Sequence, residues 1–157
     1  MSDKPHFQPE GFHSVTPSIT IKGAAAALDF YQRALGAVEL YRIEGADGTI
    51  MHAEMKIGDS IVMLSDEFPA WGALGPKSIG GASGSLMIYT EDADALTARA
   101  AAAGAIVRMP PTNQFWGDRS SMIEDPFGHR WSLATRVEIV PPEEIKKRAG
   151  NWAANNC

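Results

Sequence analysis

The feature of this sequence that most constrains its fold is an internal repeat. Residues 14–65 and 83–136 follow one plan: a strand-like segment, a helical segment that ends at a glycine, and three more strand-like segments. Three landmarks recur in the same order in both halves: Ile19 with Leu86, Gly36 with Gly104, and Gly58 with Gly128. A repeat of this kind predicts two βαβββ modules in an α+β fold, with curved mixed sheets that form a trough.

Three other segments flank or join the modules. Residues 1–13 are polar and proline-bearing, which predicts an N-terminal arm. Residues 66–82 are rich in glycine and contain Trp71, and we interpret them as the linker between modules. Residues 137–157 contain a helix start at Pro141, so we expect a C-terminal helix followed by a frayed tail from Asn151.

Composition narrows the class of protein. The formal net charge is −5, and the one basic cluster, Lys146–Arg148, suits the last turn of a helix, so nucleic-acid binding is not expected. The single cysteine, Cys157, leaves no internal disulfide. Because no signal peptide or long apolar stretch is present, we expect a cytoplasmic protein that does not enter the membrane.

Strand alternation predicts which side chains face the helices. Residues such as Ile19, Met51 and Met55 belong to the helix-facing side. The opposite faces mix hydroxyls, methionines, an aromatic ring and ionisable groups, as ligand pockets do. On this open side we expect Thr16, Ser18, Thr20, His52, Glu54, Met63, Ser85, Met87, Tyr89, Arg130 and Ser132.

Three segments resemble a known family: Ala26–Tyr31 with Leu35–Ala37, Phe115–Arg119, and Asp125–Trp131. They look like the vicinal oxygen chelate superfamily, which includes glyoxalase I, extradiol dioxygenases and bleomycin-binding proteins, and most closely its PhnB-like subgroup. The resemblance covers residues 14–136 and implies the fold predicted above. It does not select one activity, because this fold hosts several chemistries.

The metal enzymes of that superfamily carry one ligand on each of four strands. In this chain the matching positions are Thr16, Met63, Ser85 and Ser132. Hydroxyls and a thioether are poor ligands for the divalent ions that these enzymes use. We therefore predict no cofactor and disfavour a divalent metal.

His52 and Glu54 are the candidates for acid–base chemistry. They lie two residues apart on one strand, so both side chains share a face, roughly 6.5–7 Å apart along the backbone. A carboxylate beside an imidazole can orient it as a general base. The alternatives are two ligands of a displaced metal site, or a polar pair satisfied by cross-strand partners or by Arg130.

Phe115, Trp116 and Arg119 lie in a segment, 110–119, that we expect to be a long loop at the rim of the trough. Trp116 could stack on a planar ligand and Arg119 could hold an acidic group. The alternative is that Trp116 fills a dimer interface and Arg119 pairs with Asp118 or Glu124.

These observations favour a homodimeric small-molecule binding protein that sequesters a drug-like or aromatic metabolite. The alternative is a lyase, isomerase or dioxygenase of the glyoxalase type that uses His52 and Glu54. A third class, a pure interaction module, has only the rim and the exposed tail in its favour.

Overall fold

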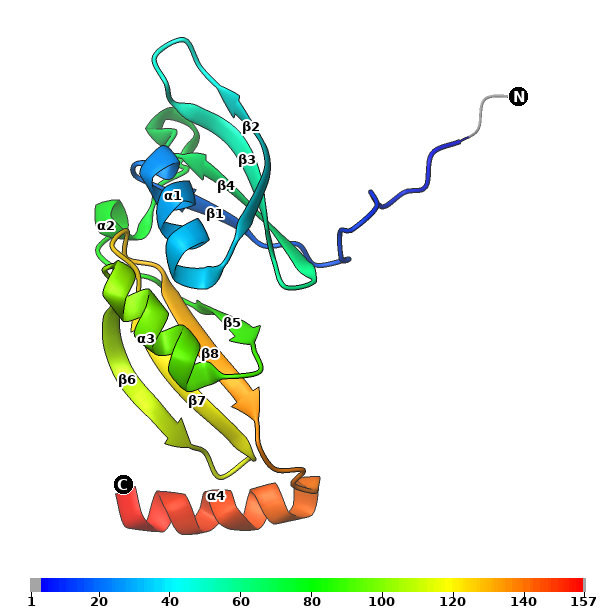
Figure 1. Ribbon diagram of the computed structural model, residues 1–157, viewed down its shortest axis with the longest axis vertical. Coiled ribbons are helices and arrows are strands. Elements are labelled where there is room, and N and C mark those ends of the chain that lie inside the picture. Colours follow the sequence, from blue (N-terminus) through cyan, green and yellow to red (C-terminus); the bar gives the residue numbers. More distant parts are fainter. Residues whose placement is uncertain (1–3, 157) are drawn as a thin grey trace. The chain divides into compact units, whose positions relative to one another are not determined.

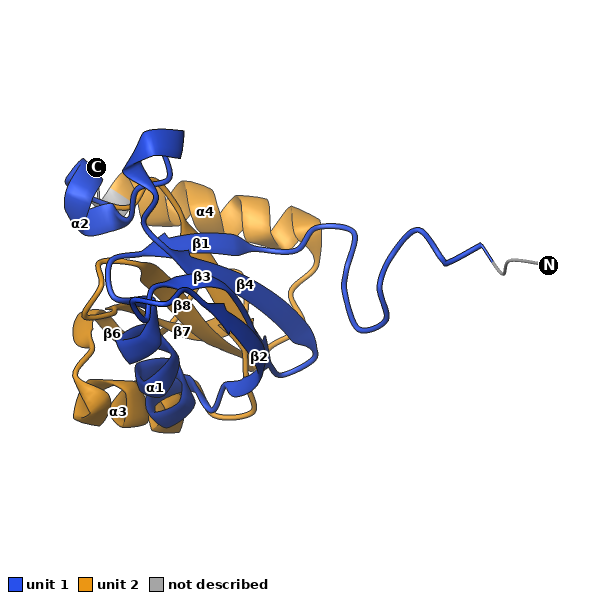
Figure 2. Cartoon of the chain, turned by 90° about the horizontal axis from the view of Figure 1, so that it is seen from above, with its two compact units in different colours: residues 1–81 blue, residues 82–157 orange. Residues whose placement is uncertain are grey.

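A computed structural model describes residues 4–156. The chain divides into two compact units, residues 1–81 and 82–157 (Figure 2). Each unit contains one four-stranded mixed sheet with a helix between its first and second strands. The strand orders, β1-β4-β3-β2 and β5-β8-β7-β6, are equivalent, so the predicted repeat of βαβββ modules is confirmed.

In unit 1 the first strand runs parallel to the fourth, and the other neighbours are antiparallel (Figure 1). The elements are β1 (Ser18–Ile21), α1 (Ala24–Leu35), β2 (Val38–Glu44), β3 (Ile50–Ile57) and β4 (Ser60–Asp66). The apolar stripe of α1 packs on the sheet face that carries Ile21, Met55 and Leu64, all of them buried.

Asp66 organises the start of α1, which lacks a side-chain cap of its own. Its Oδ1 accepts the N–H groups of Gly23 and Ala24, each at 2.9 Å, and its Oδ2 accepts that of Ile50 at 2.8 Å. The far end of α1 stops at Gly36, whose φ of 68° is the left-handed conformation that glycine tolerates best.

The connection between the modules contains two short helices, η1 (Pro69–Trp71) and α2 (Pro76–Ile79). The rings of Phe68 and Trp71 stack there with centroids 5.1 Å apart.

In unit 2 the same pairing recurs, with β5 parallel to β8 and the remaining neighbours antiparallel. The elements are β5 (Ser85–Tyr89), α3 (Ala93–Ala103), β6 (Ile106–Asn113), β7 (Asp118–Glu124), β8 (Arg130–Arg136) and α4 (Pro142–Asn156). Asp92 caps α3 by accepting the N–H of Ala95 at 2.9 Å. The face of α3 that carries small side chains packs on β7, where the hydroxyl oxygens of Thr97 and Ser121 lie 2.6 Å apart.

Helix α4 is held within unit 2 by the segment that precedes it and by Phe115 of the β6–β7 turn. The Arg148 guanidinium binds both carboxylate oxygens of Glu138, at 2.8 and 2.9 Å, and Glu144 at 3.1 Å. The ring of Trp152 lies 6.2 Å from that of Phe115. The predicted tail is therefore wrong for residues 151–156, which continue the helix, and Cys157 lies outside the described residues.

Two expectations about strands were also wrong. The strand expected from Ser14 begins at Ser18, because Thr16 turns its hydroxyl to the His13 carbonyl (2.8 Å) and leaves Val15 85% exposed. Met51 is 51% exposed and Ile50 is buried in its place. The reason is a register shift that places two residues of β3 opposite one of β2 and reverses the alternation there.

Segment 110–119 is not the long loop that we expected. Strand β6 continues to Asn113 and β7 begins at Asp118, which leaves a tight turn of four residues. No helix among residues 4–156 is long and apolar enough to cross a membrane.

Candidate functional site

The open face of the unit 1 sheet carries a row of paired residues, one from each strand. Ser18 pairs with Met63, Met63 with Glu54, and Glu54 with Tyr41. His52 lies two residues along β3 from Glu54, on the same face, as alternation predicted.

Glu54 is the centre of this face. It is 8% exposed, and its Oε1 accepts the hydroxyl of Tyr41 at 3.0 Å and lies 3.2 Å from Nε2 of His52. The hydrogen bond to Glu54 raises the pKa of Tyr41, since the carboxylate stabilises the protonated phenol. The rings of Tyr41 and His52 lie 5.7 Å apart. His52 and Glu54 are thus brought together, with Tyr41 as a partner that sequence reasoning missed.

The open face of the unit 2 sheet carries three methionines in one row. Met87 pairs with Ser132, Ser132 with Met122, and Met122 with Met109. Met87 is exposed, whereas Ser132 is buried. Thioether side chains adapt to irregular apolar shapes, so this row is suited to contact with a flat apolar group.

Asp118 joins two aromatic side chains at the end of the same face. It is 6% exposed, and its Oδ2 accepts both the hydroxyl of Tyr89 (3.1 Å) and the indole N–H of Trp116 (3.0 Å). The hydrogen bond to Asp118 raises the pKa of Tyr89. The carboxylate therefore holds two rings, from β5 and from the β6–β7 turn, beside the methionine row.

The other expected site residues are placed differently. Arg119 lies on the α3 side of β7, where Nε and Nη2 bind Asp94 at 2.5 and 2.7 Å and Nη1 binds Asn113, so it does not join Trp116. Arg130 is the register partner of Ser85, and its Nε lies 3.9 Å from Oε2 of Glu124. Phe115 packs edge-on against Trp116, with ring centroids 4.9 Å apart.

The donors present do not fit a divalent metal. Met63, Ser85 and Ser132 offer a thioether and two hydroxyls, and Thr16 lies before β1 with its hydroxyl on the His13 carbonyl. Among the residues that the structure describes, no three His, Cys, Asp or Glu side chains gather closely enough to hold an ion.

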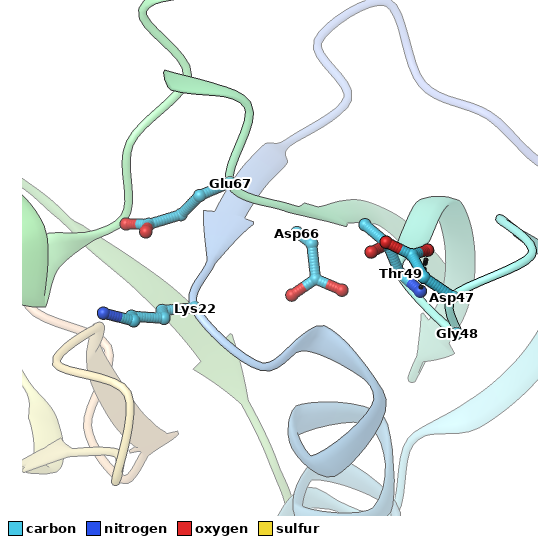
Figure 3. A pocket seen from close by; sticks show the side chains of 6 residues that line it. All are labelled: Lys22, Asp47, Gly48, Thr49, Asp66 and Glu67. Carbon is cyan, nitrogen blue, oxygen red and sulfur yellow. Dashed lines mark hydrogen bonds between the residues drawn. The ribbon is translucent and has the colours of Figure 1, made fainter. Parts of the chain in front are cut away.

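Unit 1 also has a shallow polar depression of about 350 Å³, lined by Lys22, Asp47, Gly48, Thr49, Asp66 and Glu67 (Figure 3). Its carboxylates already serve the backbone. Asp66 holds α1 and β3, Asp47 accepts the N–H of Thr49 (3.1 Å), and Glu67 accepts that of Gly75 (2.7 Å). Hydrogen bonds from Ser78 and Gly75 also lower the pKa of Glu67. The carboxylates that line this depression therefore have a structural role, which is to hold the adjoining turns and the start of α1.

Tyr41, Asp118, Met109 and Met122 were not among the expected site residues. Asp118 was expected only as a partner of Arg119, and strand alternation could not relate it to Trp116, because Trp116 lies in the turn before β7. No signal in the sequence pointed to Tyr41, because the register of β2 against β3 shifts twice.

The glyoxalase/bleomycin resistance protein/dioxygenase family model matches residues 11–133, most of the chain. The chain belongs to this superfamily. This superfamily member is 40% identical over 136 residues to the protein Mb0911c of Mycobacterium bovis, covering 85% of this chain and 90% of that one.

Solved structures agree with the family. TioX from Micromonospora sp. ML1 has a TM-score of 0.62 and 26% identity, covering 80% of this superfamily member and 99% of that chain. The protein PA1353 from Pseudomonas aeruginosa has a TM-score of 0.63 and 26% identity over the same shares of the two chains. The βαβββ repeat is the fold that these proteins share with this chain.

Proposed function

We propose that this superfamily member binds a flat, largely apolar small molecule, such as an aromatic metabolite or a drug, and sequesters it without chemical change. The observation that carries the proposal is the row of Met87, Met122 and Met109 beside the Tyr89–Trp116 pair on the open face of unit 2. Aromatic rings and thioethers provide broad, adaptable contact with planar ligands.

We propose that the protein binds this ligand without a divalent metal. This proposal is supported by the donor chemistry of Thr16, Met63, Ser85 and Ser132. Elemental analysis of protein purified without chelator or affinity tag tests it directly. We expect no stoichiometric zinc, nickel, iron or manganese, and no uptake on titration. One equivalent of any of these ions per chain would contradict the metal-free proposal.

We also propose a homodimer of the PhnB-like subgroup that works in the cytoplasm. The segments Ala26–Tyr31 and Asp125–Trp131 support the subgroup, and a lone cysteine at position 157 suits a reducing compartment. Multi-angle light scattering should give twice the mass of the 16.9 kDa chain. A monomer at micromolar concentration would contradict the dimer.

Binding is tested by titrating the protein with a panel of planar aromatic metabolites and antibiotics while tryptophan fluorescence is recorded. We expect saturable quenching with at least one compound, and Trp116→Phe should remove most of it. Trp71→Phe is the matched control, because Trp71 stacks on Phe68 in unit 1, whereas the methionine row belongs to unit 2. Absence of saturable binding across the panel would contradict the proposal.

A second candidate is an enzyme that uses unit 1. The observation in its favour is that Tyr41 and His52 both reach Oε1 of Glu54, so a proton could move between an imidazole and a substrate while Glu54 orients the ring. If a substrate is found, His52→Ala should lower kcat by about 100-fold or more. Full activity of that variant would remove the enzyme candidate.

A further inference from the structure

Asp118 is a buried carboxylate in which one oxygen accepts hydrogen bonds from side chains of residues 4–156 and the other accepts none. Its Oδ2 receives two hydrogen bonds, from Tyr89 and Trp116, and both donors are neutral groups. Among the described residues no Lys, Arg or His lies within ion-pair distance of it. Arg136, its register neighbour on β8, is exposed and makes no ion pair with it, although its charge is close enough to act on the pKa of Tyr89.

The second oxygen, Oδ1, remains an acceptor. No described residue donates a hydrogen bond to it. Within the described part of the chain, no side-chain oxygen is both fully buried and without a partner, so Oδ1 must reach the surface. A carboxylate that is largely removed from water and lacks a cation gains much from a charged donor.

We propose that Asp118 receives the cationic nitrogen of the ligand, so that the site is selective for flat aromatic molecules bearing an ammonium, amidinium or protonated ring nitrogen. The inference rests on the proposed binding function and names its ligand class. Oδ1 accepts the N–H of the ligand, while Oδ2 keeps its hydrogen bonds from Tyr89 and Trp116. The methionine row contacts the apolar remainder of the ligand.

The charge of the whole chain favours the same class. The net charge of −5 favours the approach of cations over anions. Arg136, opposite Asp118 on β8, acts against this preference, so the selectivity is smaller than an isolated Asp118 would give.

The test uses three probes that share one tricyclic ring system: cationic proflavine, neutral acridone and anionic acridinecarboxylate. Isothermal titration of the full chain should give a Kd for proflavine at least tenfold below that for acridone, and weaker binding still for the anion. Asp118→Asn keeps the shape and an acceptor for Tyr89 and Trp116. It should weaken proflavine by about 10- to 100-fold and acridone by less than about twofold.

Asp59→Asn is the matched control, since it removes one negative charge from an exposed turn of unit 1 and should leave all three affinities unchanged. Equal binding of the three probes, or equal loss for proflavine and acridone in Asp118→Asn, would overturn the cation preference and leave the binding function standing. Saturable binding of none of the three would count against both proposals.

A measurement on the unmodified chain covers the case in which Asp118→Asn does not fold. Carbodiimide-activated coupling of an amine labels accessible carboxylates, and mass spectrometry locates the label. Saturating proflavine should slow the labelling of Asp118 at least fivefold and leave that of Asp59 unchanged. Equal labelling of Asp118 with and without proflavine would overturn the assignment, and so would no labelling in either state, because Oδ1 must be accessible to receive a ligand.

Discussion

The hydroxyl of Tyr41 donates a hydrogen bond to Oε1 of Glu54 at 3.0 Å. The bond crosses the β2–β3 ladder on the open face of unit 1. A tyrosine–carboxylate hydrogen bond also occurs in unit 2, where Tyr89 on β5 donates to Asp118 on β7 at 3.1 Å, with β8 between the two strands. In both units the tyrosine is exposed and the carboxylate is buried. Each open face therefore presents a phenol whose ionisation is controlled by a carboxylate beneath it.

The first prediction concerns the ionisation of these phenols. Tyr41 and Tyr89 both have raised pKa values in the folded protein, first because of the hydrogen bond to the carboxylate. Glu54→Gln should lower the pKa of Tyr41, and Asp118→Asn that of Tyr89, toward the ordinary value of 10.0. An ultraviolet absorbance titration of the folded protein measures this, with Asp59→Asn as the unchanged control.

The sign of the stability effect follows from the raised pKa. These hydrogen bonds stabilise the fold fully below a pH of about 10, and the contribution is lost as the pH rises through the higher folded pKa. Denaturant titrations should therefore show the wild type losing its advantage over Glu54→Gln in that alkaline range. An advantage that grows with alkaline pH would contradict the assigned partner.

The second prediction concerns Gly117, in the turn between β6 and β7. Its φ of 104° strains any other residue, and an added Cβ would overlap the carbonyl oxygen of Glu138 and lie 2.9 Å from Cγ2 of Val140. Gly117→Ala should lower the free energy of unfolding by about 3–5 kcal/mol, measured in urea.

Gly48→Ala provides the control for backbone strain alone. Gly48 also has a positive φ, 80°, but an added Cβ would meet nothing within 4 Å. It should cost about 1–2 kcal/mol. If the two variants lose the same stability, the close approach of Glu138 to the turn contributes nothing.

The third prediction concerns Asp125, in the turn before β8. The carboxylate is buried and accepts the N–H groups of Phe127 and His129 and the indole N–H of Trp131, at 2.9, 3.0 and 2.9 Å. Asp125→Ala should lower the free energy of unfolding by about 3–5 kcal/mol, because it leaves these donors without their acceptor. Asp59→Ala, in the β3–β4 turn, should change it by less than about 0.5 kcal/mol.

The fourth prediction concerns acid. Arg148 lowers the pKa of Glu138 through a hydrogen bond, so this pair stabilises the attachment of α4 above the ordinary pKa of 4.5 and loses that effect as the pH falls through the lower folded value. Limited proteolysis should cut α4 faster in that acidic range. Glu138→Gln should show fast cleavage already at neutral pH, and an unchanged rate in this variant would exclude the pair as the tether.

The local elements of this chain follow from its sequence. The order of a strand, a helix that ends at Gly36 and three further strands in unit 1 was predicted from periodicity and from the recurring glycines. The shared face of His52 and Glu54 followed from alternation along one strand. These features depend on neighbours a few residues apart, so local propensity is sufficient to specify them.

The assembly of the candidate sites was decided by tertiary structure. Tyr41 meets Glu54 only through a ladder whose register shifts twice, and the shift at its far end is what exposes Met51. Asp118 lies 29 residues from Tyr89, and β7 had to begin within an expected loop for the two to meet. Cross-strand register depends on the packing of a whole sheet against its helix, and no short stretch of sequence contains that information.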